Sequence, residues 1–211
     1  GKAVRNRDGG SLSDMQEGLR YVLAHPQVFA LIVLSILPFL FGMPLNTLLP
    51  AFNQDVLHGH ADDLGYLISA MGGGAIIGSL LMAAMGDLRR KGFWLIVSCL
   101  SWGVVTAAFG AFDMQLVALA LIALIGMLSS WNMSLNRGML QMAVAGHMRG
   151  RIMSIDMMAH GLMPLGVFPI SLVAEYHGVG AALVVSGFAL MIITLLAIFF
   201  LPSVRRTLRA E

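Results

Sequence analysis

Six long apolar runs divide this chain and leave little of it for any other kind of structure. They cover about residues 28–52, 64–85, 93–112, 114–145, 152–174 and 180–201. A helix of about 20 apolar residues is long enough to cross the hydrocarbon core of a bilayer. Because 58% of the residues are hydrophobic and 11% are charged, polar side chains cannot cover the apolar surface in water. We therefore expect an all-α membrane protein with six transmembrane helices.

The basic residues fall on alternate flanks of these runs, with Arg137 as the exception. They are Lys2, Arg5, Arg7 and Arg20 before the first run, Arg89, Arg90 and Lys91 after the second, Arg149 and Arg151 after the fourth, and Arg205, Arg206 and Arg209 after the sixth. The other connectors carry acids instead, namely Asp55, Asp62, Asp63, Asp113 and Glu175. The positive-inside rule then predicts that both termini are cytoplasmic. Basic residues gathered in one leaflet would meet anionic lipid headgroups, so the net charge of +2 does not indicate nucleic acid.

The runs also predict the division of the chain. Residues 1–26 form the end of a cytoplasmic loop with a short interfacial helix over 11–24, residues 27–202 form the bundle, and residues 203–211 form a cytoplasmic tail. The chain begins without Met, and its first apolar run is too long for a signal peptide. We expect a fragment of a longer protein.

Prolines interrupt the first run at Pro38, Pro44 and Pro50, and Asn46 and Thr47 lie between the last two. Proline removes a backbone donor, and the carbonyls it frees must meet protein or a wet cavity. One interpretation is a bent helix whose Asn46 and Thr47 face a substrate pathway. The other is a proline kink packed against neighbouring helices, with no ligand.

Small residues recur every four positions in the second and fourth runs. They are Ala70, Gly74 and Gly78 in the second, and Gly126, Ser130, Ser134 and Gly138 in the fourth. Such spacing lets helix backbones approach closely within a bilayer, so it predicts two close-packing faces.

Four segments carry a resemblance to a known family. The loop 86–92 contains Asp87 with Arg89, Arg90 and Lys91, and resembles the cytoplasmic signature loop of major facilitator superfamily transporters as it recurs in their second half. Ala83 and Leu88 stand where that signature has Gly and Arg. The segments 65–74, 149–154 and 161–166 are similar to the branch that contains enterobactin-type siderophore exporters and multidrug effluxers.

This resemblance covers the whole chain and implies the last six of twelve helices, built as an inverted three-plus-three repeat. It implies a proton-driven exporter of amphipathic small molecules in a bacterial inner membrane, working by alternating access with an N-terminal six-helix half as its partner. It also implies that Asp87, Arg89, Arg90, Lys91, Arg149 and Arg151 belong to the cytoplasmic signature loops. No cofactor and no enzymatic activity are expected.

Arg137 and Asp156 are charges inside the fourth and fifth runs, and His160 follows Asp156 by one helical turn. Their positions are symmetric about 146–147, so an antiparallel helix pair would hold Arg137 and Asp156 at one depth. An unpaired charge there is costly, which predicts an ion-pair clamp. The alternative is that Asp156 and His160 carry the coupling proton.

Two asparagines in the fourth run, Asn132 and Asn136, lie one turn apart and are predicted either to face the substrate pathway or to bond neighbouring helices. The cluster His58, His60, Asp62 and Asp63 could be drawn as a metal site, but we expect none, since Asp62 or Asp63 suits the start of a helix better.

Two rival functions remain open. A six-helix intramembrane enzyme would need a serine in a Gly-x-Ser-Gly turn and a partner histidine, but Ser186 lacks the preceding glycine and spacing places no such serine opposite His160. A non-transporting membrane scaffold is the other rival, and the polar residues in the runs weigh against it.

Overall fold

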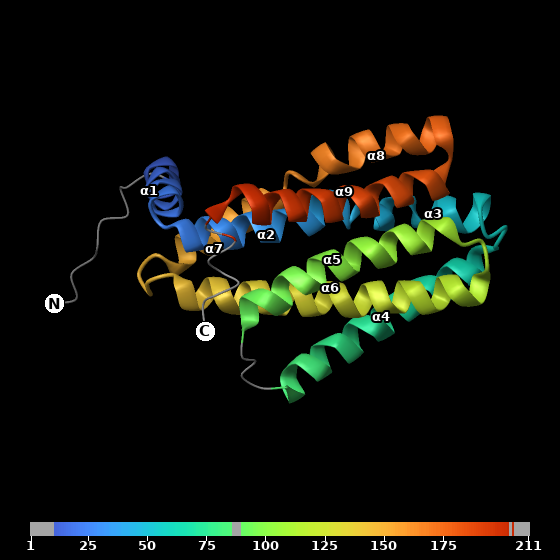
Figure 1. Cartoon of the computed structure of the whole chain (residues 1–211), viewed down its shortest axis with the longest axis horizontal. Coiled ribbons are helices and arrows are strands. Elements are labelled where there is room, and N and C mark those ends of the chain that lie inside the picture. The colour runs from blue at the N-terminus through green and yellow to red at the C-terminus, as the bar shows by residue number, and fades with distance from the viewer. Residues whose placement is uncertain (1–10, 86–89, 203, 205–211) are drawn as a thin grey trace.

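A computed structural model describes residues 11–85, 90–202 and 204, and within these ranges the chain forms nine helices and no strand (Figure 1). The helices are α1 (Ser11–Ala24), α2 (Pro26–Phe41), α3 (Pro44–Asp55), α4 (Ala61–Ala84), α5 (Lys91–Ala111), α6 (Gln115–Ala143), α7 (Arg149–His160), α8 (Met163–His177) and α9 (Val179–Phe200). They supply six stretches long and apolar enough to cross a membrane, because α2 with α3 and α7 with α8 each make one crossing. The predicted all-α fold with six crossings is confirmed.

The crossings are enclosed to different degrees. Those made by α2–α3 and α5 are mostly buried within the bundle, whereas α4 and α7–α8 flank it and bury little of their surface (Figure 1). Helix α2 packs against α6, α8 and α9. Leu34 of α2 is fully buried, and Phe52 of α3 stacks on Phe109 of α5 with ring centroids 4.5 Å apart. The first crossing therefore forms the centre of the fold.

Glycines allow the backbones of α4 and α6 to pack in direct contact. A Cβ on Gly74 would overlap the carbonyl of Ala123, and one on Gly78 would lie 2.5 Å from the carbonyl oxygen of Met127. Gly126 of α6 lies equally close to the backbone of Met71. The predicted close-packing face of α4 is confirmed. The predicted face of α6 does not extend to Gly138, because a Cβ there would meet nothing within 4 Å.

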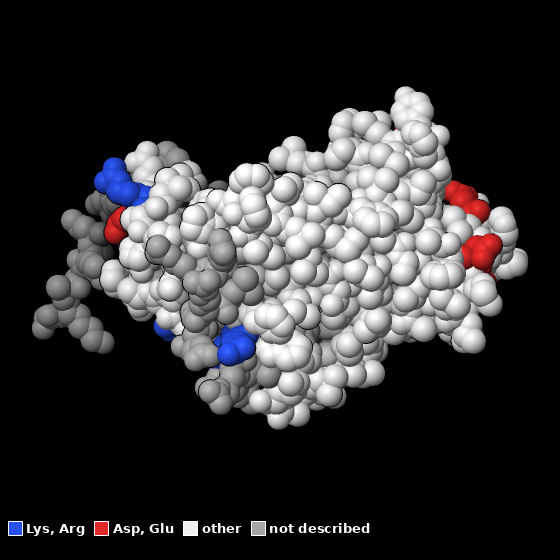
Figure 2. All heavy atoms as spheres, viewed as in Figure 1, with Lys and Arg blue, Asp and Glu red and all other residues white. Residues whose placement is uncertain are grey.

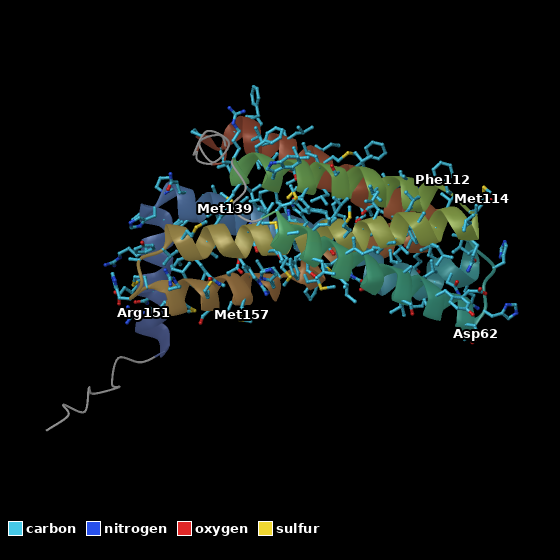
Figure 3. The ribbon with its side chains drawn as sticks, turned by 90° about the horizontal axis from the view of Figure 1, so that it is seen from below. Asp62, Phe112, Met114, Met139, Arg151 and Met157 are labelled. Atoms are coloured by element: carbon cyan, nitrogen blue, oxygen red, sulfur yellow. The ribbon has the colours of Figure 1, made fainter. Side chains whose placement is uncertain are left out.

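Charges gather at the two ends of the bundle. Figure 2 shows the described Lys and Arg side chains at one end and Asp and Glu mainly at the other. Figure 3 places Arg151 at the first end and Asp62 at the second, and we call these the basic end and the acidic end. The charge alternation seen along the sequence is thus a separation in space.

Helix α1 has the predicted bounds and rests against α7 at the basic end. Val22 is buried, and Gly18 leaves room for the side chain of Ile155. Glu17 pairs with Arg151 at 2.6 Å. Met15, Leu19 and Leu23 remain exposed, so the outward face of α1 is apolar, as an interfacial helix requires.

Candidate substrate pocket

Two adjoining pockets lie along one face of the bundle. The large pocket has a volume of about 270 Å³, and the small pocket has about 140 Å³. Both are lined by Met43, Ala75, Trp102 and Ser129. Arg137 places the large pocket nearer the basic end, since it lies two turns before α6 ends there. Together the two pockets follow α2–α3, α4 and α6 along the direction of the helices.

The break between α2 and α3 shapes the pocket wall. Pro44 begins α3 and cannot donate to the preceding turn, and the N–H groups of Gly42 and Met43 both donate to the carbonyl of Pro38, at 2.7 and 3.1 Å. On the inner side, the hydroxyl of Ser186 donates to the carbonyl of Phe41. The first crossing is thus interrupted between α2 and α3, with one side packed on α9 and the other lining both pockets.

A second break separates α7 from α8, and the sequence did not predict it. The N–H groups of Gly161 and Leu162 turn back to carbonyls only three residues earlier, Met158 at 2.9 Å and Ala159 at 3.1 Å. Pro164 then opens α8. In the sequence, Gly161 and Pro164 are the signal for this break. The consequence is that His160 sits at a helix end rather than inside a continuous helix.

His160 is held on three sides. Its Nδ1 lies 2.5 Å from the backbone carbonyl oxygen of Asp156, which only accepts, so Nδ1 carries a hydrogen. Its Nε2 lies 3.3 Å from the hydroxyl of Ser35, and Phe39 meets the ring edge-on with centroids 3.8 Å apart. Spacing along the sequence does not predict this neighbour, since the packing of α2 brings Ser35 there, and Ser35 lies inside α2 and not in a Gly-x-Ser-Gly turn.

Asp156 is buried one turn before His160, at 1% exposure. Its Oδ2 lies 3.9 Å from Nδ1 of His160, and its Oδ1 has no hydrogen-bond partner among the described residues. A buried carboxylate oxygen without a partner is unusual in a folded protein.

The predicted clamp between Arg137 and Asp156 does not form. In the part of the chain that the structure describes, no ion pair joins them. The reason is lateral placement, since α2 lies between α6 and α7. Asn136 of α6 donates to the carbonyl of Leu31 at 2.9 Å, and His160 of α7 meets Ser35 on the same helix. Arg137 is instead exposed at the wall of the large pocket.

The four predicted pathway residues divide into two pairs. Asn132 and Asn136 line the large pocket but are buried, and Asn132 donates to the Ser98 hydroxyl at 2.8 Å and lies 3.0 Å from the Cys99 sulfur. They therefore bond neighbouring helices. Asn46 is exposed and lines the small pocket, whereas Thr47 is exposed but lines neither of these two pockets.

The predicted signature-loop residues are only partly described. Asp87 and Arg89 lie outside the described residues. Arg90 has a left-handed backbone, with φ of 63°, and precedes Lys91 at the start of α5. Arg149 is exposed at the start of α7, and Arg151 pairs with α1. Where the structure describes these residues, they lie at the basic end.

The acidic end is tied by hydrogen bonds that the sequence only partly predicted. Asp63 accepts from the backbone N–H of His60 at 2.8 Å, which caps α4 as expected. The other oxygen of Asp63 accepts from Gln115 of α6 at 3.1 Å, and Asn53 of α3 donates to the carbonyl of His60 at 2.9 Å. No group of metal-ligating side chains occurs in the described ranges.

Comparisons with known proteins place this arrangement among transporters. A family profile described as "Transmembrane secretion effector" matches residues 8–208. The chain is 27% identical to a staphyloferrin A transporter of Staphylococcus aureus over 179 residues, which are 85% of this chain and 45% of the relative. It is 30% identical to the enterobactin exporter EntS of Shigella boydii over 201 residues, 92% of this chain and 47% of the relative.

A macrolide efflux protein A of Streptococcus pyogenes is 23% identical over 190 residues, which are 89% of this chain and 47% of the relative. The chain thus spans about half the length of the curated relatives it matches. No solved structure matches it significantly.

Proposed function

Because the chain belongs to the transmembrane secretion effector family of the major facilitator superfamily, we propose that it forms the C-terminal half of a secondary exporter of amphipathic small molecules. The observation that carries this proposal is the pocket pair beside the bend between α2 and α3. A transporter needs a binding site near the membrane midplane, and broken helices are its usual source. Relatives named as exporters or efflux proteins support the direction of transport.

The missing partner is a second six-helix half. The pockets open on a face of the bundle, so another bundle seated there would close them into a cavity. The relatives are about twice as long as this chain, which is the length that two such halves require. Alternating access then follows from one bundle rocking against the other around the cavity. We call the protein that joins both halves the complete transporter.

The charge separation supports an orientation in a bacterial inner membrane. The basic end faces the cytoplasm and the acidic end faces outward, because cytoplasmic connectors retain Lys and Arg. Both termini are then cytoplasmic. In this orientation the large pocket lies toward the cytoplasmic side, from which an exporter loads its substrate.

Asp156 and His160 are the residues we propose for proton coupling. Asp156 has an unpartnered oxygen, and the ring of His160 lies between its carboxylate, 3.9 Å away, and Ser35 at the pocket wall, so the two residues lie in line toward the proposed substrate site. A purely structural role is the alternative, since His160 already bonds a carbonyl. Substrate counterflow separates the two roles. Asp156→Asn should retain counterflow and lose gradient-driven transport if Asp156 carries the proton, and should lose both if it is structural.

An intramembrane hydrolase is the rival that the pairing of Ser35 with His160 raises. Hydrolysis of an acyl group also needs backbone N–H donors for the developing oxyanion. Ser35 lies in the middle of α2, where those donors are used within the helix. The relatives are transporters, which are not enzymes.

Everted membrane vesicles test the proposed function. Vesicles that contain the complete transporter should take up amphipathic dyes when a proton gradient is imposed, and vesicles without it should not. The proposal would be refuted by equal uptake in the two preparations, or by a gene that encodes no second six-helix half.

A further inference from the structure

Helix α1 runs across the direction of the crossings at the basic end (Figures 1 and 3). It contacts Arg151 and Ile155, which belong to the first two turns of α7. This is the level at which the fifth crossing begins, so it is where the bundle, the lipid headgroups and water meet. A helix that lies there in the plane of the membrane presents a different face to each of the three.

One face of α1 is buried against the bundle. Val22 is 4% exposed, and a Cβ on Gly18 would lie 2.6 Å from the side chain of Ile155. Glu17 pairs with Arg151 at 2.6 Å. Helix α7 depends on these contacts, because it packs chiefly against α1 and α2 and a break separates its far end from α8.

An apolar stripe lies on the next face of α1 and remains exposed. It consists of Met15, Leu19 and Leu23, which are 38%, 52% and 66% exposed. At about 100° per residue, Arg20 lies beside Leu23 at the edge of the stripe, and Ala24 lies beyond Arg20, away from both the stripe and the bundle. Arg20 is exposed and has no ion-pair partner among the side chains that the structure describes.

An apolar stripe bordered by a cation matches the headgroup layer of an anionic leaflet. The apolar side chains can enter the boundary of the acyl chains, while the long stem of Arg20 keeps its guanidinium among the lipid phosphates. The surroundings have the same sign, since the described Lys and Arg side chains gather at this end (Figure 2). A zwitterionic leaflet would accept the stripe equally well but would offer Arg20 no net negative charge.

We propose that α1 binds anionic lipid with its apolar stripe and Arg20, and that this binding holds α1 against α7. The surface lies outside both pockets, so the inference goes beyond the proposed transport function. Attachment to the leaflet confines α1 to the layer in which α7 begins, which raises the effective concentration of its buried face beside Ile155. Lipid composition then sets how firmly α7, the helix that carries Asp156 and His160, is held.

Cysteine labelling in lipid nanodiscs tests this effect. The complete transporter, without other reactive cysteines, carries Val22→Cys, whose thiol is covered while α1 rests on the bundle, and the native Cys99 is buried. A neutral, water-soluble maleimide should modify this thiol about fivefold more slowly in phosphatidylglycerol than in phosphatidylcholine, the factor that one basic residue near an anionic surface contributes. Arg20→Gln should remove the difference, and so should about 1 M salt, which screens surface charge.

Two controls separate docking of α1 from general effects of the lipid. Arg149→Gln removes the same charge at the same end but on α7, and it should leave the lipid difference at Val22→Cys intact. Ala24→Cys is exposed in the docked helix, so it corrects for any direct effect of an anionic surface on thiol reactivity. The inference is overturned if Val22→Cys reacts equally in the two lipids after this correction, or if the difference survives Arg20→Gln.

A bimane fluorophore attached to Leu19→Cys identifies what covers the stripe. Phosphatidylglycerol with brominated chains quenches bimane on contact, so quenching should be strong at Leu19→Cys and weak at Ala24→Cys. Equal quenching at the two positions, or none at Leu19→Cys, would mean that the N-terminal half, another protein or water faces the stripe, and would overturn the inference. Neither measurement depends on transport, so failure of the proposed exporter function would leave both results intact.

Discussion

Arg137 and Asp156 show that two charges at one membrane depth need not interact. Symmetry about the α6–α7 connector places them in one layer, but α2 separates them laterally. Each charge is consequently accommodated by its own surroundings. Arg137 lies at the wall of the large pocket, and Oδ2 of Asp156 lies 3.9 Å from Nδ1 of His160.

This separation predicts additive mutational effects. Asp156→Asn and Arg137→Gln should change the free energy of unfolding independently, so that the double variant equals the sum of the single variants within about 0.5 kcal/mol. Thermal unfolding of the detergent-purified proteins measures all three. A double variant clearly more stable than that sum would mean that the two charges pair after all.

Asn132 predicts a different outcome, because its amide joins two helices. Asn132→Leu removes the bond to Ser98 in α5 and should destabilise the protein by about 0.6 kcal/mol, the average for such bonds in membranes, and by no more than about 1.7 kcal/mol. Asn46→Leu is the control, since its exposed amide contacts only the sulfur of Met43, and it should cost less. Equal losses of thermal stability in the two variants would contradict this account.

At the scale of elements, the contact of α4 with α6 depends on the absence of side-chain atoms at Gly74. We expect Gly74→Ala to force the two helices apart, because the new Cβ would overlap the backbone of Ala123, and to cause a large loss of folded protein. Gly73→Ala is a control on the same helix, where a Cβ meets nothing within 4 Å. Folded yield after detergent extraction compares the two, and similar yields would argue against the contact.

The existence of these elements could be predicted from the sequence, because hydropathy predicts the six crossings and the prolines predict an interruption near Phe41. The break after His160 could not, because Gly161 and Pro164 are also compatible with a continuous helix that is kinked at the proline. The pocket was predicted only in part. Of the predicted pathway residues, Asn132 and Asn136 line the large pocket and Asn46 lines the small pocket. Arg137 and Ser35 reach the large pocket through the order in which the helices pack, which local periodicity does not encode.

At the scale of the whole molecule, the separation of charge predicts which surfaces face each side of the membrane. A cysteine placed at His58, near the acidic end, should react with an impermeant maleimide in intact cells. One placed at His147, at the basic end, should react only after the membrane is opened. Both positions are exposed, and the native Cys99 is buried, so labelling reports location. The reverse pattern would invert the proposed orientation.

The central place of α2 also has a consequence for biosynthesis. Among the crossings of this chain α2 is made first, yet it packs against α6, α8 and α9, which leave the ribosome later. Until then its inner face, with Ser35 and the bend at Pro38, stands in lipid or against the insertion machinery. Assembly of the bundle therefore cannot be completed from the N-terminus onward. We expect nascent chains stalled before α6 to hold α2 in the membrane unassembled, open to crosslinking with insertase subunits and to proteolytic quality control.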